Sequence, residues 1–244
     1  MDDTYSFLLP AMPSDHARQT RGLDIVKARV KAGFLPKTII DVGCGLGGSR
    51  RQLLSFIKGA TWLGIDIEES PEVNARPQTR EDMRSYDGVN LPVESGSVDL
   101  AYSHQVFEHV RYPEQLLKDI SRVLTPDGLF IGQTSHLEPY HSRSIFNFTP
   151  YGWKLICEAN GLEVIELRPS IDGQTLVERT ASSQSHKFNQ WFLKESPINR
   201  QISRAEKAKG TATQRINFKK LNISGQFCFV CRRKPPKPKA IFHI

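Results

Sequence analysis

Residues 38–48 read Thr-Ile-Ile-Asp-Val-Gly-Cys-Gly-Leu-Gly-Gly and constrain the fold more than any other stretch of the chain. The β-branched apolar residues before the glycines predict a buried strand, and the apolar spacing over residues 53–57 predicts a helix after them. Glycines let the chain turn sharply and let a ligand approach the backbone without a Cβ in the way. The stretch therefore predicts a strand, a turn and a helix that together bind a nucleotide.

The spacing of the glycines leaves the kind of nucleotide open. Gly43, Gly45 and Gly48 fit the dinucleotide pattern G-x-G-x-x-G, and Asp66 follows where that pattern expects an acid, about 20 residues further on. A nicotinamide-dependent oxidoreductase is one interpretation. Asp41, two residues before the first glycine, favours another, because a carboxylate at the end of the strand suits a cationic ligand better than a pyrophosphate.

The pattern D-x-G-x-G-x-G, followed by an acid at the end of the next predicted strand, resembles motif I of the class I S-adenosylmethionine-dependent methyltransferases. Three further stretches resemble that family in the same order, at residues 87–99, 106–109 and 122–131. The resemblance covers roughly residues 38–168 and is closest to the type 11 branch. It implies an α/β fold with a Rossmann-like, doubly wound seven-stranded sheet, mostly parallel with an antiparallel seventh strand, and helices on both faces.

The resemblance implies S-adenosyl-L-methionine as the cofactor, held at the ends of the first strands. Asp66 ends a strand predicted over residues 60–67 and would accept both ribose hydroxyls. Asp87 would meet the adenine amino group, and Asp82 is the alternative because no helix can be identified over residues 68–83. The loop at His104 would close over the methionine end. The predicted cofactor-binding residues are Asp41, Gly43, Cys44, Gly45, Asp66, Ile67, Asp87, Gly88 and His104.

Histidines follow the fourth and fifth predicted strands, where a methyl acceptor should arrive. Methyl transfer requires alignment of the nucleophile and, for a hydroxyl acceptor, removal of its proton, for which histidine has a suitable pKa. We rank His109 first as the base, then His136 and His141. Glu108 and Glu138 can in principle join these histidines around a divalent metal, but no tight ligand spacing supports this, so we predict no metal.

The four cysteines do not form a disulfide framework in such a chain. Cys228 and Cys231 have zinc or redox spacing, but they stand in an apolar, strand-like run without a second ligand pair, so we interpret them as core residues. The N-terminus is acidic, and no apolar run approaches the ~20 residues that a membrane span needs. These features predict a cytoplasmic protein.

Positive charge is concentrated at the C-terminal end. Residues 186–244 hold 14 Lys/Arg against two acids, within a net charge of +7 for the whole chain. This asymmetry permits contact with an anionic substrate or a peripheral contact with an anionic membrane surface. A nucleic-acid-binding module is the non-catalytic alternative, but no RNA-binding motif accompanies the charge and aromatic residues are sparse in the basic tract, so nucleic acid is not the favoured partner.

We divide the chain into an N-terminal helical cap over residues 1–37, a class I methyltransferase domain over 38–231 and a basic tail over 232–244. An insertion at about 169–222, between strands six and seven, is where substrate-specific structure is expected, because connections of this length are commonly functional. The predicted activity is methyl transfer to a small molecule or glycan, at a hydroxyl oxygen of a sugar or lipid-linked glycan. The oligomeric state is left open.

Overall fold

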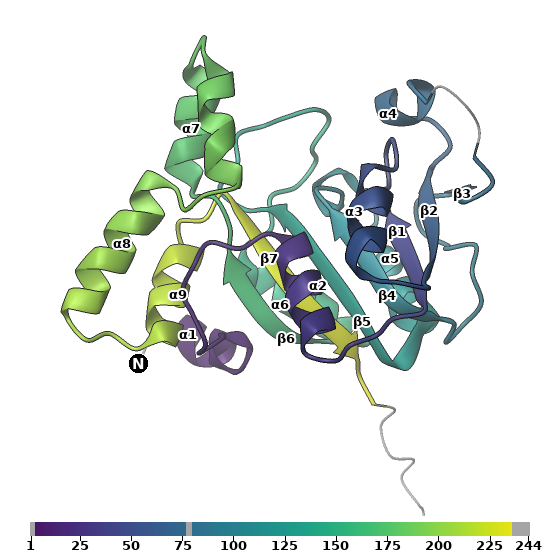
Figure 1. Ribbon diagram of the computed structural model, residues 1–244, viewed down its shortest axis with the longest axis horizontal. Coiled ribbons are helices and arrows are strands. Elements are labelled where there is room, and N and C mark those ends of the chain that lie inside the picture. Colours follow the sequence, from purple (N-terminus) through teal and green to yellow (C-terminus); the bar gives the residue numbers. More distant parts are fainter. Residues whose placement is uncertain (1–2, 77–79, 236–244) are drawn as a thin grey trace, which may run out of the picture.

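The computed structural model describes residues 3–76 and 80–235 (Figure 1). These residues form a seven-stranded sheet in the order β3-β2-β1-β4-β5-β7-β6, in which only β7 runs antiparallel to its neighbours. The predicted fold class is confirmed. The strands are β1 (Thr38–Val42), β2 (Thr61–Ile67), β3 (Met83–Tyr86), β4 (Val98–His104), β5 (Leu124–Ser135), β6 (Leu162–Pro169) and β7 (Gln226–Arg233).

Helices cover both faces of the sheet (Figure 1). Successive strand residues face opposite sides, so Ile39 and Ile40 of β1 belong to two different hydrophobic clusters. On one side, α2 (Gly22–Lys31) and α3 (Gly48–Phe56) pack on the sheet. On the other, α5 (Pro113–Val123) and α6 (Pro150–Ala159) pack on the sheet, and Trp153 of α6 is fully buried.

The N-terminal residues pack on both faces of the sheet and do not form one separate cap. Helix α1 (Asp3–Leu8) and the 3-10 helix η1 (Leu9–Ala11) lie on the α6 side, where the rings of Tyr5 and Phe218 are 4.9 Å apart. The chain then passes the sheet edge, and α2 begins at Gly22. Before this helix, the carboxylate of Asp15 accepts a hydrogen bond from Arg168.

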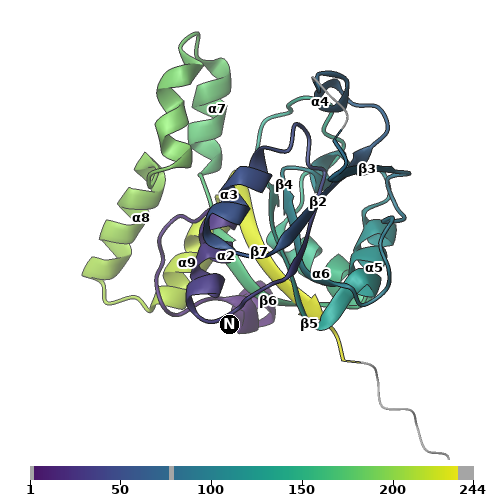
Figure 2. The same ribbon diagram turned by 45° about the vertical axis from the view of Figure 1, so that its right-hand side comes forward.

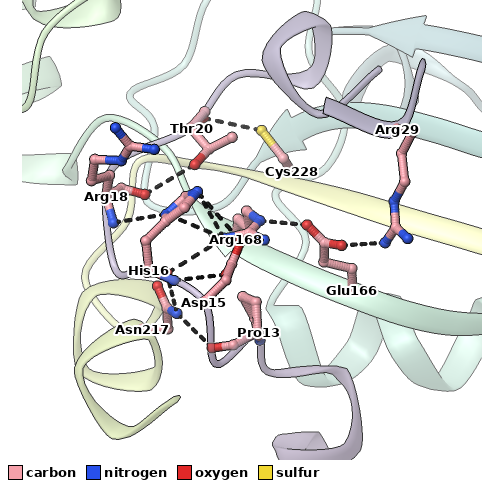
Figure 3. A network of polar contacts seen from close by, with 10 residues as sticks. All are labelled: Pro13, Asp15, His16, Arg18, Thr20, Arg29, Glu166, Arg168, Asn217 and Cys228. Carbon is pink, nitrogen blue, oxygen red and sulfur yellow. Dashed lines mark hydrogen bonds and ion pairs between the residues drawn. The ribbon is translucent and has the colours of Figure 1, made fainter. Parts of the chain in front are cut away.

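A polar network fixes this extended segment against β6 (Figure 3). Arg168 is buried and forms ion pairs with Asp15 and Glu166, and Glu166 also pairs with Arg29 of α2. Asn217 donates to two backbone carbonyls of the segment. A cavity of about 780 Å³ adjoins the network, but none of the predicted cofactor residues lines it. The network therefore holds the N-terminal segment in place at a distance from the glycine turn.

The connection between β6 and β7 is helical. It contains α7 (Gly173–Ala181), η3 (Ser185–Phe192), α8 (Pro197–Ala208) and α9 (Thr213–Leu221). Helix α9 joins the main core through Phe218 and Leu221, whereas α7 and α8 stand away from the sheet (Figures 1 and 2). The region expected to carry substrate-specific structure thus projects beside the carboxyl ends of the strands only through α7.

The last strand ends later than the sequence predicted. β7 pairs with β5 as far as Arg232 and with β6 as far as Arg233, so these two residues belong to the sheet and not to a tail that begins at 232. Arg232 thus has a strand on both sides, and its side chain pairs with Glu163 at 2.8 Å. Residues 236–244 of the predicted tail lie outside the described residues.

The cysteines of β7 are core residues, as predicted. Cys228 and Cys231 are buried and belong to the clusters on opposite faces of the sheet, so they cannot bind one ion together. Among the described residues, no helix combines the length and the apolar character that crossing a bilayer requires.

Candidate functional site

The glycine turn follows β1 as the sequence predicted. Gly43, Gly45 and Gly47 have φ angles of 73°, 51° and 77°, which residues with a Cβ rarely adopt. The backbone N–H of Gly43 donates to the carbonyl of Ile65 at 2.7 Å and so ties the turn to β2. The turn therefore places its backbone at the carboxyl ends of β1 and β2, where open α/β sheets bind ligands.

The structure brings most of the predicted cofactor residues to this edge. Asp66 and Ile67 end β2 and pair in register with Ser85 and Tyr86, so Asp87 and Gly88 follow directly beside them. Asp82 precedes the other end of β3, which favours Asp87 over Asp82 for the adenine contact. The side chains of Leu46 and Ile67 are 58% and 41% exposed there, although both are large and apolar.

Asp66 holds the glycine turn and an arginine. Its carboxylate accepts from the N–H of Gly45 at 2.7 Å and lies 3.5 Å from the guanidinium of Arg76. Burial raises the pKa of Asp66, while the hydrogen bonds to it oppose the rise. Arg76 was missed in the sequence, although Ser70 and Pro71 signal the short helix α4 (Pro71–Asn74) before it: the Ser70 hydroxyl accepts from the N–H of Val73.

Two of the predicted cofactor-binding residues, Asp41 and Cys44, have buried side chains. The carboxylate of Asp41 is buried and accepts a hydrogen bond from the Ser49 hydroxyl of α3. Burial raises its pKa to about 7. The side chain of Cys44 is also buried, so this residue offers the turn only its backbone. Asp41 therefore presents no freely accessible carboxylate to a ligand in this conformation.

The raised pKa of Asp41 predicts a pH-dependent stability. Its carboxyl has an ordinary pKa of 3.8, so between about pH 4 and 7 the folded protein keeps a proton that the unfolded chain loses. We expect this group to stabilise the fold at low pH and to remove a few kcal/mol from the free energy of unfolding as the pH rises through that window. Denaturant unfolding at pH 5 and 8 tests this, and Asp41→Asn should flatten the difference. Equal pH dependence in both proteins would contradict it.

His104 ends β4 at the same edge as Asp66. Its side chain is accessible to solvent, yet the surrounding protein lowers its pKa through desolvation. The next residue, Gln105, has a φ of 55°, a strained value for a residue other than glycine. Strain of this kind clusters at functional sites. The segment after β4 therefore turns sharply toward the end of β5.

Glu108, His109 and His141 come together beyond this turn. One potential ligand atom of each lies within 4.8 Å of the other two. The rings of His109 and His141 meet edge to face, 5.4 Å apart, and Nε2 of His141 is 3.9 Å from the Glu108 carboxylate. The carbonyl of Glu108 accepts the N–H groups of Ile145 and Phe146, which holds the loop of His141 in place. Burial lowers the pKa of His109 and raises that of Glu108.

His136, the third predicted catalytic histidine, lies elsewhere. It lines a groove of about 500 Å³ between the loop after β5 and α7, and its ring faces Phe227 at 6.5 Å. Glu138 and Val177 line the same groove. Burial lowers the pKa of His136 as well. The structure therefore divides the predicted histidines into a pair beside Glu108 and a separate residue in the groove.

The chain is similar in sequence to known methyltransferases. Residues 40–132 match a family model described as a methyltransferase domain. A probable S-adenosylmethionine-dependent methyltransferase of Mycolicibacterium smegmatis is 25% identical over 167 residues, 59% of this chain and 64% of that protein. The tocopherol O-methyltransferase of Arabidopsis thaliana is 34% identical over 102 residues, 39% of this chain and 29% of that protein. The chain thus spans less than two thirds of the length of either relative.

A solved structure supports the fold. The 1,6-didemethyltoxoflavin-N1-methyltransferase of Burkholderia thailandensis, with bound S-adenosylhomocysteine, matches with a TM-score of 0.53 at 14% identity, over 88% of this chain and 77% of that chain. The matched domain begins within β1 and ends within β5, so it contains the glycine turn, Asp66 and the pair Glu108-His109. The similarity to methyltransferases thus covers the part of the chain that holds the glycine turn and the ends of β1, β2 and β4.

Proposed function

We propose that the protein binds S-adenosyl-L-methionine at the carboxyl ends of β1–β4 and transfers its methyl group to a small-molecule acceptor. The observation that carries the proposal is the place of Asp66, whose carboxylate lies against the glycine turn at the end of β2. A carboxylate there can accept both ribose hydroxyls of an adenosine. The exposed apolar side chains of Leu46 and Ile67 fit the cofactor, because they offer surface to an adenine ring.

The residues of this site divide by task. Asp66 would hold the ribose, Asp87 and Gly88 would border the adenine, and His104 would face the methionine end. When bound, the cofactor supplies an electrophilic methyl carbon on a sulfonium sulfur. The chain itself must then align the acceptor and, for a hydroxyl, remove its proton, and His109 beside Glu108 would perform that second task.

The acceptor would enter from the side of β5 and α7. The groove that contains His136 has a largely apolar lining with the carboxylate of Glu138 at one side. Glu138 contacts the hydroxyl of Ser135 at 2.6 Å, and Ser135 in turn contacts Glu108. The groove and the histidine pair are therefore linked by a short polar chain. This arrangement supports an acceptor with an apolar body and a hydroxyl oxygen, in keeping with the tocopherol O-methyltransferase among the relatives.

A more specific proposal is that the acceptor is a sugar or a lipid-linked glycan. The protein would then act in the cytoplasm, and its basic C-terminal region would contact an anionic membrane surface. Part of that positive charge is already engaged: Arg232 pairs with Glu163, and Lys234 donates to the carbonyl of Glu158 at 2.6 Å. Binding to an anionic surface would therefore depend on the other lysines and arginines of this region.

Calorimetric titration with S-adenosylhomocysteine tests the cofactor site directly. We expect one molecule to bind per chain. Incubation with the methyl donor and a panel of hydroxylated aromatic compounds and sugars, followed by mass spectrometry, then tests transfer. A chain that binds no S-adenosylhomocysteine while it remains folded would refute the proposal.

A further inference from the structure

We propose that Glu108, His109 and His141 bind a divalent cation at the acceptor side of the site. Their potential ligand atoms already lie within 4.8 Å of one another. Donors about 2.1 Å from a shared ion lie at most ~4.2 Å apart, so small side-chain rotations bring the three into one coordination sphere. The side chain of His141 is 32% exposed and has room for such a rotation.

The hydrogen bonding of His141 is typical of a metal ligand. Its Nδ1 lies 3.2 Å from the carbonyl of Pro139, which can only accept, so in the neutral ring the proton sits on Nδ1 and Nε2 faces Glu108 with a lone pair. Histidines that bind metals commonly donate their other ring N–H to a carbonyl in this way, which fixes the tautomer and the ring orientation.

The carboxylates at the site have no lysine or arginine partner among the described residues. The Glu108 side chain is fully buried, and its two oxygens accept from the hydroxyls of Thr134 and Ser135 at 3.0 and 3.1 Å. Ser135 has one proton to donate, yet it also contacts the carboxylate of Glu138 at 2.6 Å. Within residues 3–76 and 80–235, neither carboxylate forms an ion pair with a lysine or arginine. A buried carboxylate without a compensating charge is costly, and a bound cation would remove that cost.

The donor set indicates the kind of ion. Two imidazoles and one carboxylate suit Mn²⁺, Fe²⁺, Co²⁺ or Zn²⁺ and leave coordination positions open. This step rests on the proposed methyltransferase function: an ion here would chelate an acceptor with two adjacent oxygens, such as a catechol or a vicinal diol, and favour loss of its hydroxyl proton to solvent. His109 would then be a ligand of the ion and not the base.

Calorimetric titration of the chelator-treated full chain with Mn²⁺ and Zn²⁺ tests the site. We expect one ion per chain, and a loss of affinity of at least ~100-fold in Glu108→Gln and in His141→Ala, because even outer-shell changes cost ~10–100-fold. His186→Ala is the matched control, since His186 is an exposed histidine of η3 outside the cluster. This variant should bind the ions as the unmodified chain does.

Two results would overturn the inference: no ion bound by the unmodified chain, or equal affinity in the cluster variants and in His186→Ala. A cooperative thermal unfolding transition shows that a variant is folded. If Glu108→Gln does not fold, His141→Ala alone is compared with the control. Titration of the metal-free chain with S-adenosylhomocysteine separates the two proposals. Cofactor binding without ion binding removes only the cation site, whereas ion binding without cofactor binding removes only the methyltransferase proposal.

Discussion

Gly43→Ala should lower the free energy of unfolding by about 2–5 kcal/mol and abolish measurable binding of S-adenosylhomocysteine. Gly43 has a φ of 73°, where a residue with a Cβ is strained by ~1–2 kcal/mol. The added Cβ would also lie 2.3 Å from Cγ2 of Val106, a short β-branched side chain that cannot swing aside. Overpacking of this kind costs a further ~1–3 kcal/mol. Denaturant unfolding and calorimetric titration measure the two effects.

Gly48→Ala is the matched control for this prediction. Gly48 belongs to the same glycine stretch, but it begins α3, its φ is ordinary and a Cβ there would meet no atom within 4 Å. Replacement of glycine at a compatible position stabilises proteins by ~0.4–1 kcal/mol through the unfolded state. We therefore expect unchanged or slightly higher stability. Equal destabilisation by both substitutions would show that the turn does not have the geometry described.

The sequence was sufficient for the parts of the fold that depend on local patterns. The glycine turn, the alternation of strands and helices and the antiparallel last strand all follow from periodicity, breakers and the family resemblance. The bounds of β3 were not predicted, because this strand has only four residues, which are partly exposed and lack the alternation that marks a strand. The sequence favoured Asp87 over Asp82 for the adenine contact only through its spacing from Leu91 and Pro92, and the register of β3 beside β2 adds a spatial argument for the same choice.

The histidines illustrate the same limit at the site. His109 and His141 are far apart in the sequence, and no ligand spacing connects them. They meet because the carbonyl of Glu108 binds two N–H groups of the loop after β5, a contact between elements that no local pattern encodes. His136 follows the same strand but turns to the groove beside α7. Sequence proximity to a strand end thus pointed to this edge of the sheet but not to the side chains that lie together there.

Asp66→Ala should weaken the binding of S-adenosylhomocysteine by about 100-fold or more. A carboxylate that accepts two hydroxyls contributes ~1.5–3 kcal/mol for each hydrogen bond, and 1.4 kcal/mol corresponds to a factor of ten in affinity. The contribution of Asp66 to the binding free energy is smaller than the sum of two such bonds. Its carboxylate already accepts from the N–H of Gly45 and lies near Arg76, and a ribose must displace or share these contacts. Calorimetric titration of the unmodified and substituted chains measures the difference.

Asp82→Ala is the corresponding control, because it removes a carboxylate at the opposite end of β3. The side chain of Asp82 pairs with Arg50 and Arg80 and not with the proposed cofactor residues, so the affinity for S-adenosylhomocysteine should not change.

Arg76→Ala removes the guanidinium that competes for Asp66 and should raise the affinity for S-adenosylhomocysteine several-fold. If Asp66→Ala and Asp82→Ala bind S-adenosylhomocysteine equally well, the ribose is not held at the end of β2, and a cofactor that binds does so at another edge of the sheet.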